Sequence, residues 1–362
     1  VCFGTGSLTP GRSLHGSGLD LAATSRWPAS SCVLPDRLAS PGGLGQAWSQ
    51  LVDYLLVERR LYTGDFTSEI PRKFQGSTLR AVRVPAAWAK ARSIPSQKKV
   101  TVALVDSGIQ AGHEDLKSNI VTGYNVMDKN ADTQDTTGHG TAMAGVVGAV
   151  TNNDKGISGV ADHIKLMPIR VYGTIAFRHF SDAINYAVDS KVDLIILSAS
   201  WKPKNAAVEA SITKATQANI PLICASGNRG KNVSLPGETS YPCEYSKTLD
   251  GIICVSGTDN AGMNLHSKSN YAPFVDVAAP ANVYSTTLSG GYDSFAGTSG
   301  SAAIVAGVIA MMKSVAPRPL SVKEIKSIII STSTPGVKSF DGKAPMPFGR
   351  LDALRTMEKV IR

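Results

Sequence analysis

The stretch GGYDSFAGTSGSAAIVAGVIAMM, residues 290–312, decides how this chain folds. Its second half is rich in alanine, has no proline before Pro317 and is apolar on nearly every face, which predicts a helix buried in a core. A small-residue turn before it places Ser299 at the N-terminus of that helix. Free N–H groups and the positive dipole end favour negative charge there, so Ser299 suits a nucleophile whose attack creates an oxyanion. The competing interpretation is that Thr298 or Ser299 only caps the helix.

Composition excludes several classes of protein. The 362 residues are 43% hydrophobic and 18% charged, which is typical of a globular chain. No uninterrupted apolar run reaches the ~18–20 residues of a membrane span, so we expect no transmembrane segment. Residues 1–99 hold 13 basic and 6 acidic residues, so they carry most of the net charge of +9. The remainder is nearly neutral, and we expect no nucleic-acid partner because such a partner requires a basic face.

The chain changes character along its length. Residues 1–77 begin with a Gly-, Ser- and Pro-rich stretch and predict an irregular lead or the remnant of a pro-segment. Residues 79–91 predict an extended arm followed by a helix that starts near Pro85. From Lys99 onward, short apolar runs rich in β-branched residues alternate with helical stretches.

This alternation predicts an α/β fold with three layers, in which helices flank a mostly parallel central sheet. The expected strands are residues 100–105, 164–171, 192–197, 220–225, 251–256 and 274–278. The expected helices are residues 141–150, 180–190 and 206–217, and three more that begin at Ser299, Ser321 and Gly349.

Two polar motifs follow the first strand. Asp106 comes directly after the apolar run, and active groups of open parallel sheets gather at the carboxyl ends of strands. A turn-capping Asp is the alternative. His139 lies between Gly138 and Gly140 at the start of an apolar helix, and these glycines let another segment pack against the imidazole. The alternative is a structural histidine, and a metal role is disfavoured because no second His or Cys lies at ligand spacing.

Asn228 ends the turn Ala225-Ser226-Gly227-Asn228 after another predicted strand. A side-chain amide in a glycine-flanked turn can donate to a developing oxyanion, and an Asn in a left-handed turn is the alternative. The four polar residues follow one another as Asp, His, Asn, Ser. The order Asp, His, Ser is that of subtilisin, whereas α/β-hydrolases run Ser, Asp, His and chymotrypsin His, Asp, Ser.

Residues 78–360 therefore resemble a subtilisin-like serine protease, a subtilase. The matching motifs are VDSGI at 105–109, GHGT at 138–141, SGN at 226–228, GTS at 297–299, VDVAAP at 275–280 and FGRLDA at 348–353. The resemblance implies a catalytic domain over residues 78–362. It further implies a serine endopeptidase that hydrolyses peptide bonds of protein substrates through an acyl-enzyme, with no cofactor for the chemistry.

The resemblance also implies a role for each matching residue. Ser299 would be the nucleophile, His139 would take its proton and pass it to the leaving amine, and Asp106 would orient His139. Asn228 would donate to the oxyanion. Substrate contacts would come from a strand that pairs with the extended substrate and from the walls of the primary pocket: Ser198, Ala199, Ser200, Ala225, Ser226 and Gly227.

Two further residues bear on specificity. Ser240 would lie near the base of the primary pocket. Arg229 follows Asn228, and we predict that its charge disfavours Lys or Arg before the scissile bond.

The chain departs from the family pattern beside the nucleophile. Gly300-Ser301 stands where most subtilases have Met-Ala, the proline that follows there is absent, and Ala281 stands where Gly is usual. A catalytically weak or inactive relative that binds peptides is therefore the alternative function. An esterase on another fold is disfavoured by the order of the residues.

Three accessory expectations complete the interpretation. Structural calcium is possible, because Asp115 lies where the family often has a ligand and residues 151–156 supply an oxygen-rich loop. Cys243 and Cys254 flank a loop and can pair in an oxidising compartment, and Cys224 is expected to be buried. We expect a monomer that is secreted or enters the secretory pathway.

Overall fold

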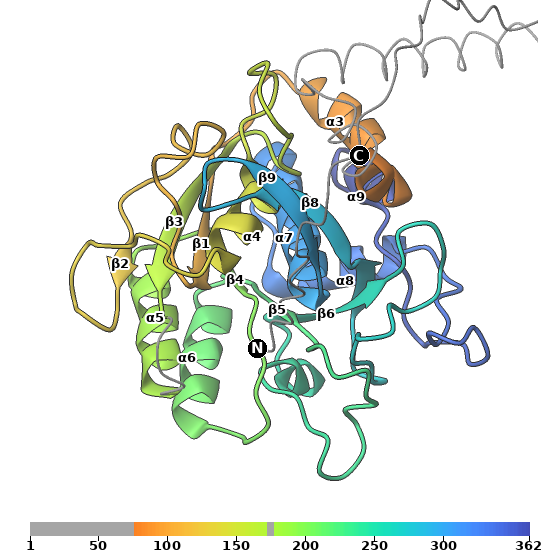
Figure 1. Ribbon diagram of the computed structural model, residues 1–362. Coiled ribbons are helices and arrows are strands. Elements are labelled where there is room, and N and C mark those ends of the chain that lie inside the picture. Colours follow the sequence, from red (N-terminus) through yellow and green to blue (C-terminus); the bar gives the residue numbers. More distant parts are fainter. Residues whose placement is uncertain (1–75, 172–176) are drawn as a thin grey trace, which may run out of the picture. The chain divides into compact units, whose positions relative to one another are not determined.

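A seven-stranded sheet forms the centre of the computed structural model, which describes residues 76–171 and 177–362 (Figure 1). Its strands are β1 Val100–Asp106, β2 Tyr124–Asn125, β3 Ile164–Arg170, β4 Leu194–Leu197, β5 Leu222–Ala225, β6 Ile252–Thr258 and β7 Val277–Pro280. They lie in the order β2-β3-β1-β4-β5-β6-β7, and every neighbouring pair runs parallel. The register of β1 with β3 runs from Val100 opposite Ile164 to Asp106 opposite Arg170.

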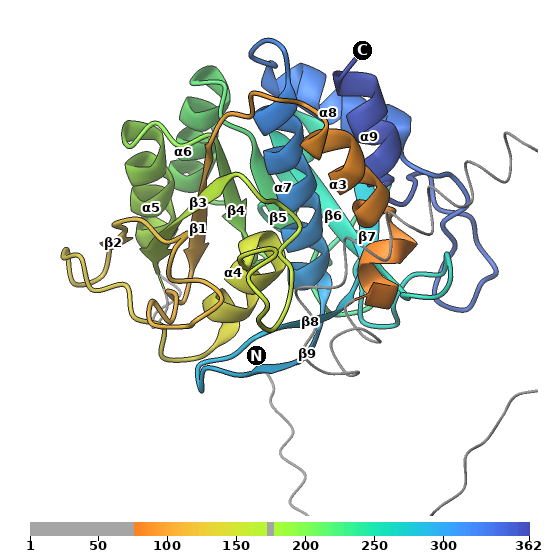
Figure 2. The same cartoon turned by 90° about the horizontal axis from the view of Figure 1, so that it is seen from above.

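Helices cover both faces of the sheet, which confirms the three-layer α/β fold (Figure 2). The helices are α3 Val84–Arg92, α4 His139–Gly148, α5 Phe177–Asp189, α6 Ala206–Gln217, α7 Thr298–Val315, α8 Val322–Thr332 and α9 Ala353–Val360. Helices α5 and α6 pack on one face and the others on the opposite face. Val102 and Leu104 join one core while Ala103 and Val105 join the other, which explains why the strands are continuous apolar runs.

Helix α7 is the buried core helix that the sequence predicts. Within the described residues it alone is long and apolar enough to cross a membrane, and 89% of it is buried inside the protein. Burial on all sides is what an all-round apolar surface requires in a globular fold.

Several sequence-based boundaries are wrong. Residues 76–81 are helical, so the arm predicted from Leu79 is not extended. The small-residue turn before Ser299 contains a strand, β9 Tyr292–Ala296, which pairs antiparallel with β8 Asn282–Thr286. Helix α9 begins four residues after Gly349, because Gly349 and Leu351 bond to the backbone of Ala278 and keep the chain extended. The rest of the predicted lead, residues 1–75, lies outside the described residues.

A disulfide joins Cys243 to Cys254, as the sequence suggested, with 5.0 Å between the two Cα atoms. It links the 3₁₀ helix η1 Cys243–Lys247 to β6. A buried ion pair lies beside it, since the Lys326 ammonium is 3.2 Å from Asp276 Oδ1 and Cys254 N donates to Asp276 Oδ2 at 2.8 Å. Cys224 is a free, buried thiol.

Candidate active site

The predicted catalytic residues lie on the segments that leave the carboxyl edge of the sheet. Asp106 ends β1, Ser198 follows β4 and Asn228 follows β5. His139 and Ser299 occupy the first and second positions of α4 and α7. Strands β2 and β3 lie on one side of β1, and β4 to β7 lie on the other, so the strand order changes direction between β1 and β4. Open α/β sheets bind ligands at such switch points.

Asp106 and His139 are in direct contact. His139 Nδ1 donates to Asp106 Oδ1 at 2.7 Å, and the Ser107 backbone N–H donates to the same oxygen at 2.8 Å. A Cβ at Gly140 would lie 2.1 Å from the Gly108 carbonyl oxygen and 3.2 Å from Asp106 Cβ. Glycine is therefore required for the His139 helix to approach the end of β1.

The imidazole is held in the form that a general base needs. Because Nδ1 donates to Asp106, the neutral ring carries its lone pair on Nε2, and no group among the described residues bonds to that atom. The Asp106 side chain is 8% exposed, whereas 40% of the His139 side chain is accessible. The negative charge of Asp106 raises the pKa of His139 above its usual value.

Asp135, which the sequence analysis missed, stabilises the start of the His139 helix. Its carboxylate is buried and accepts from the backbone N–H groups of Thr137 at 2.9 Å, Gly138 at 3.0 Å and Thr141 at 2.9 Å, and from the Thr141 hydroxyl at 2.7 Å. Burial opposes its ionisation, but these bonds prevail and lower the pKa of Asp135. A lone Asp four residues before a histidine carries no signal of this role in the sequence.

The pH dependence of activity follows from the Asp106–His139 pair. The base works only when neutral, so we expect kcat/KM to rise with pH through an apparent pKa above about 6.5, the usual value for His. Asp106→Asn should lower kcat by about 10⁴-fold and shift the acid limb to lower pH, because the charge that raises the His139 pKa is gone. A pH–rate profile of both proteins measures this, and an unshifted limb would contradict it.

Ser299 lies beside the end of β4 and makes no hydrogen bond with His139 in this structure. Its hydroxyl donates to the Ser198 carbonyl oxygen at 3.3 Å. The N-cap of α7 is Gly297, which makes no side-chain cap bond, so neither Thr298 nor Ser299 serves as the helix cap. The structure thus brings Asp106 and His139 together, and the contact between His139 and Ser299 remains a prediction.

The hairpin β8–β9 connects the segments that carry His139 and Ser299. Ser285 Oγ donates to the Ala142 carbonyl oxygen at 2.5 Å and Thr286 Oγ1 donates to that of Thr141 at 2.7 Å, so β8 is bonded to α4. The hairpin then runs directly into α7. Its position therefore determines how the two helix N-termini face each other.

Asn228 is held against the start of α7 through its side-chain oxygen. Its Oδ1 accepts from the Thr298 backbone N–H at 2.9 Å and from the Thr298 hydroxyl at 3.0 Å. The Nδ2 group makes no hydrogen bond with the described residues, so it is available to donate. A Cβ at Gly297 would lie 3.1 Å from this Nδ2, so the residue two before Ser299 must be small.

The departure at Gly300 is compensated by packing. A Cβ there would lie 3.0 Å from both terminal methyl groups of Val283, so β8 occupies the space of the missing side chain. Ser301 Oγ donates to the Pro280 carbonyl oxygen at 3.1 Å and ties the helix to β7. The start of α7 is therefore well held without a bulky residue after the nucleophile.

The predicted substrate-binding residues form one cluster. Gly227 lies among polar side chains, since a Cβ there would be 2.8 Å from Ser200 Oγ and 3.4 Å from Ser240 Oγ. Ser240 Oγ donates to the Ser226 carbonyl oxygen at 2.7 Å, which places it beside the predicted pocket wall. Ala225 and Ser226 are buried beneath the surface. The Ser198 hydroxyl is buried and has no partner among the described residues, and Ala199 is half-buried.

The Arg229 side chain is paired with Glu238. Its guanidinium donates to Glu238 Oε2 at 2.7 Å and to the carbonyl oxygens of Glu238 and Thr239 at 2.9 and 3.2 Å. Glu238 also lies 3.8 Å from the Lys202 ammonium, so this carboxylate is shared by two cations and the exclusion of basic substrate residues stays a prediction.

Both carboxylate oxygens of Asp115 accept hydrogen bonds from the protein. Asp115 Oδ1 accepts from Asn153 Nδ2 at 2.7 Å and Oδ2 accepts from the Ile157 backbone N–H at 3.0 Å. Over residues 76–171 and 177–362 no group of three or more His, Cys, Asp or Glu side chains is placed to hold a metal ion. Burial raises the pKa of Asp115, which fits a hydrogen-bonded structural carboxyl.

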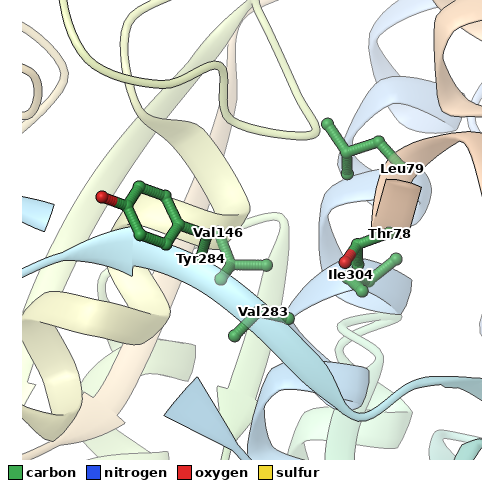
Figure 3. Close-up of a pocket in the computed structure, with 6 residues that line it drawn as sticks. All are labelled: Thr78, Leu79, Val146, Val283, Tyr284 and Ile304. Carbon is green, nitrogen blue, oxygen red and sulfur yellow. The ribbon is translucent and has the colours of Figure 1, made fainter. Parts of the chain in front are cut away.

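A small pocket elsewhere is separate from these residues (Figure 3). Its lining is mostly apolar and comprises Thr78, Leu79, Val146, Val283, Tyr284 and Ile304. None of the predicted catalytic or substrate-binding residues contributes to it, so it is not the candidate active site.

Comparison with known proteins identifies the family. The sequence pattern of the Subtilase family matches residues 97–349. The chain belongs to the subtilase family. It is 33% identical over 237 residues to thermitase of Thermoactinomyces vulgaris, covering 64% of this chain and 80% of that one. It is 31% identical over 270 residues to the major intracellular serine protease of Bacillus subtilis, covering 71% and 82%.

Solved structures agree with the assignment. A protease from Pseudoalteromonas arctica superposes with a TM-score of 0.68 at 25% identity, over 80% of this chain and 98% of that one. This subtilase is accordingly a subtilisin-like serine endopeptidase, as its sequence motifs suggested.

Proposed function

We propose that this subtilase cleaves polypeptides through a triad of Asp106, His139 and Ser299 and an acyl-enzyme intermediate. His139 Nε2 takes the Ser299 proton as Oγ attacks the scissile carbonyl carbon, and the imidazolium then protonates the leaving amine. Water repeats the sequence on the acyl-enzyme and releases Ser299. Asp106 keeps the proton on Nδ1 and stabilises the imidazolium.

One observation carries the proposal. The 2.7 Å bond between Asp106 and His139 leaves Nε2 available at the edge of the sheet where Ser299 begins a buried helix. Ser299 Oγ bonds to Ser198 here, and we propose that it turns to His139 when substrate binds, since catalytic hydrogen bonds are often long before that step.

Labelling with a fluorophosphonate probe, followed by mass-spectrometric mapping of the modified residue, tests the proposal. We expect one adduct at Ser299 that is lost in His139→Ala. The alternative function, an inactive homologue that binds peptides, predicts no adduct and measurable peptide affinity.

The Asn228 side chain should contribute strongly to kcat. We propose that Nδ2 and backbone N–H groups near Ser299 bind the oxyanion, so Asn228→Ala should lower kcat by about 10²- to 10³-fold and change KM little. Steady-state kinetics on a peptide substrate measures both constants. A variant that changed KM alone would place Asn228 in substrate binding instead.

We further propose that the protein is secreted or enters the secretory pathway. The disulfide between Cys243 and Cys254 supports this, since such bonds persist mainly in oxidising compartments.

A further inference from the structure

Beyond the residues that would touch substrate, we infer that Asn270 is a positioning residue for the oxyanion site. It holds the backbone of the loop at 226–231 so that Asn228 points its amide to where the oxyanion forms. This inference rests on the proposed function, because Asn228 acts only if Ser299 is acylated.

The Asn270 side chain bonds to the loop on both sides of Asn228. Its Nδ2 donates to the Ser226 carbonyl oxygen at 2.9 Å. Its Oδ1 accepts from the backbone N–H groups of Arg229 at 3.0 Å and Lys231 at 3.2 Å. The turn that presents Asn228 is thereby bracketed by a single amide.

The backbone of Asn270 adds a fourth bond and anchors the residue. Its N–H donates to the Gly227 carbonyl oxygen at 2.9 Å. Its carbonyl oxygen accepts from the hydroxyls of Ser226, Ser256 and Ser269 at 2.9, 2.8 and 3.0 Å. Asn270 is 1% exposed, so it cannot relax into solvent and its amide is fixed by packing.

The backbone at Gly227 packs tightly against the Asn270 side chain. Gly227 has φ 101°, and a Cβ there would lie 2.5 Å from Asn270 Nδ2. The loop backbone therefore lies directly on the Asn270 amide. Thr298 holds the Asn228 side chain itself, whereas Asn270 holds the backbone on both sides of it.

Removing the Asn270 side chain should displace the Asn228 amide without removing it. The loop has other restraints, since the Arg229 guanidinium bonds to Glu238 and the Gly230 N–H donates to the Lys268 carbonyl oxygen at 2.8 Å. Asn270 is the residue whose side chain accepts from the backbone N–H groups that follow Asn228. The N–H groups of Arg229 and Lys231 would lose their acceptor and turn toward water. Misplacement of a catalytic group by about 1 Å can cost about 10²-fold in rate, with little change in ground-state binding.

The test is a double-mutant cycle between Asn270 and Asn228. Asn270→Ala should lower kcat by about 10- to 100-fold with KM changed less than about threefold. In the Asn228→Ala background the same change should cost less than about twofold, because the donor it positions is already gone. Equal losses in both backgrounds, or a wild-type kcat in Asn270→Ala, would overturn the inference.

A graded variant and a control separate positioning from folding. Asn270→Asp keeps the acceptor for Arg229 and Lys231 but replaces the donor to Ser226 by an oxygen that repels the Ser226 carbonyl, so kcat should still fall although the bonds after Asn228 remain. If Asn270→Ala does not fold, the cycle is run with Asn270→Asp. Asn219 makes two comparable amide bonds, with Leu320 and Val322, at the opposite end of β5. Asn219→Ala should lower the melting temperature and leave kcat within about twofold.

Amide hydrogen exchange tests the role of Asn270 independently of activity. Exchange at Arg229 and Lys231 should be faster in Asn270→Ala than in wild type, and unchanged exchange would overturn the inference even in an inactive protein. A failure of the proposed function is visible separately, as wild-type protein that the fluorophosphonate does not label.

Discussion

Ser299→Ala is expected to lower kcat on the order of a millionfold, the loss that follows removal of the nucleophile or base from a working triad. The variant keeps its substrate-binding residues and its oxyanion site, so KM should change little. His139→Ala should cost a similar amount, and the double variant little more, because the two side chains act as a unit. Hydrolysis of a chromogenic peptide measures all three proteins.

A matched control guards this result against contamination and general damage. Ser294 is an exposed serine on β9, five residues before Ser299. Ser294→Ala should keep kcat within about twofold. Retention of more than a few per cent of activity in Ser299→Ala would assign the chemistry to another residue.

The largest expected effect on stability is at Lys326. Its side chain is 14% exposed, and the ammonium also donates to the carbonyl oxygens of Ser246 and Ile252. Lys326→Ala would leave the buried Asp276 carboxylate without its cation, and loss of one partner from a buried pair costs about 3–5 kcal/mol of the free energy of unfolding. Chemical denaturation at neutral pH, with the disulfide intact, measures this change.

The pH dependence of that loss gives a second check. Burial raises the pKa of Asp276, and Lys326 opposes this rise. Without Lys326 the native state should hold the Asp276 proton to higher pH, so the deficit should shrink as pH falls toward about 4. The exposed pair Lys214–Asp189 is the control, since Lys214→Ala should cost at most about 1 kcal/mol. Similar losses at Lys214 and Lys326 would contradict the account.

The central sheet and its helices were predictable because burial on both faces leaves a plain pattern. β1 is a continuous apolar run since its residues alternate between two cores, and α7 is apolar all round since every side is packed. The hairpin was missed for the opposite reason. β9 is largely exposed and polar, and β8 is held by hydroxyl bonds to α4 that no periodicity encodes.

The same contrast applies to the site. Asp106, His139, Asn228 and Ser299 were found because each stands in a short glycine-containing motif at the end of a strand or the start of a helix. Asp135 acts through backbone N–H groups two to six residues further along the chain, and Asn270 through those of a loop 39 to 41 residues away. Such contacts form only after folding. Glu238 pairs with Arg229 from nine residues away, which the sequence alone does not reveal.

The central claim is that Asp106, His139 and Ser299 meet as one catalytic unit. A crystal structure of the protein with a peptide aldehyde bound covalently to Ser299 tests it most directly. We predict that His139 Nε2 lies within about 2.6–3.2 Å of Ser299 Oγ or of the adduct oxygen, with Asn228 Nδ2 donating to the oxyanion. An adduct on another residue, or an imidazole that cannot reach Ser299 while bonded to Asp106, would contradict the account.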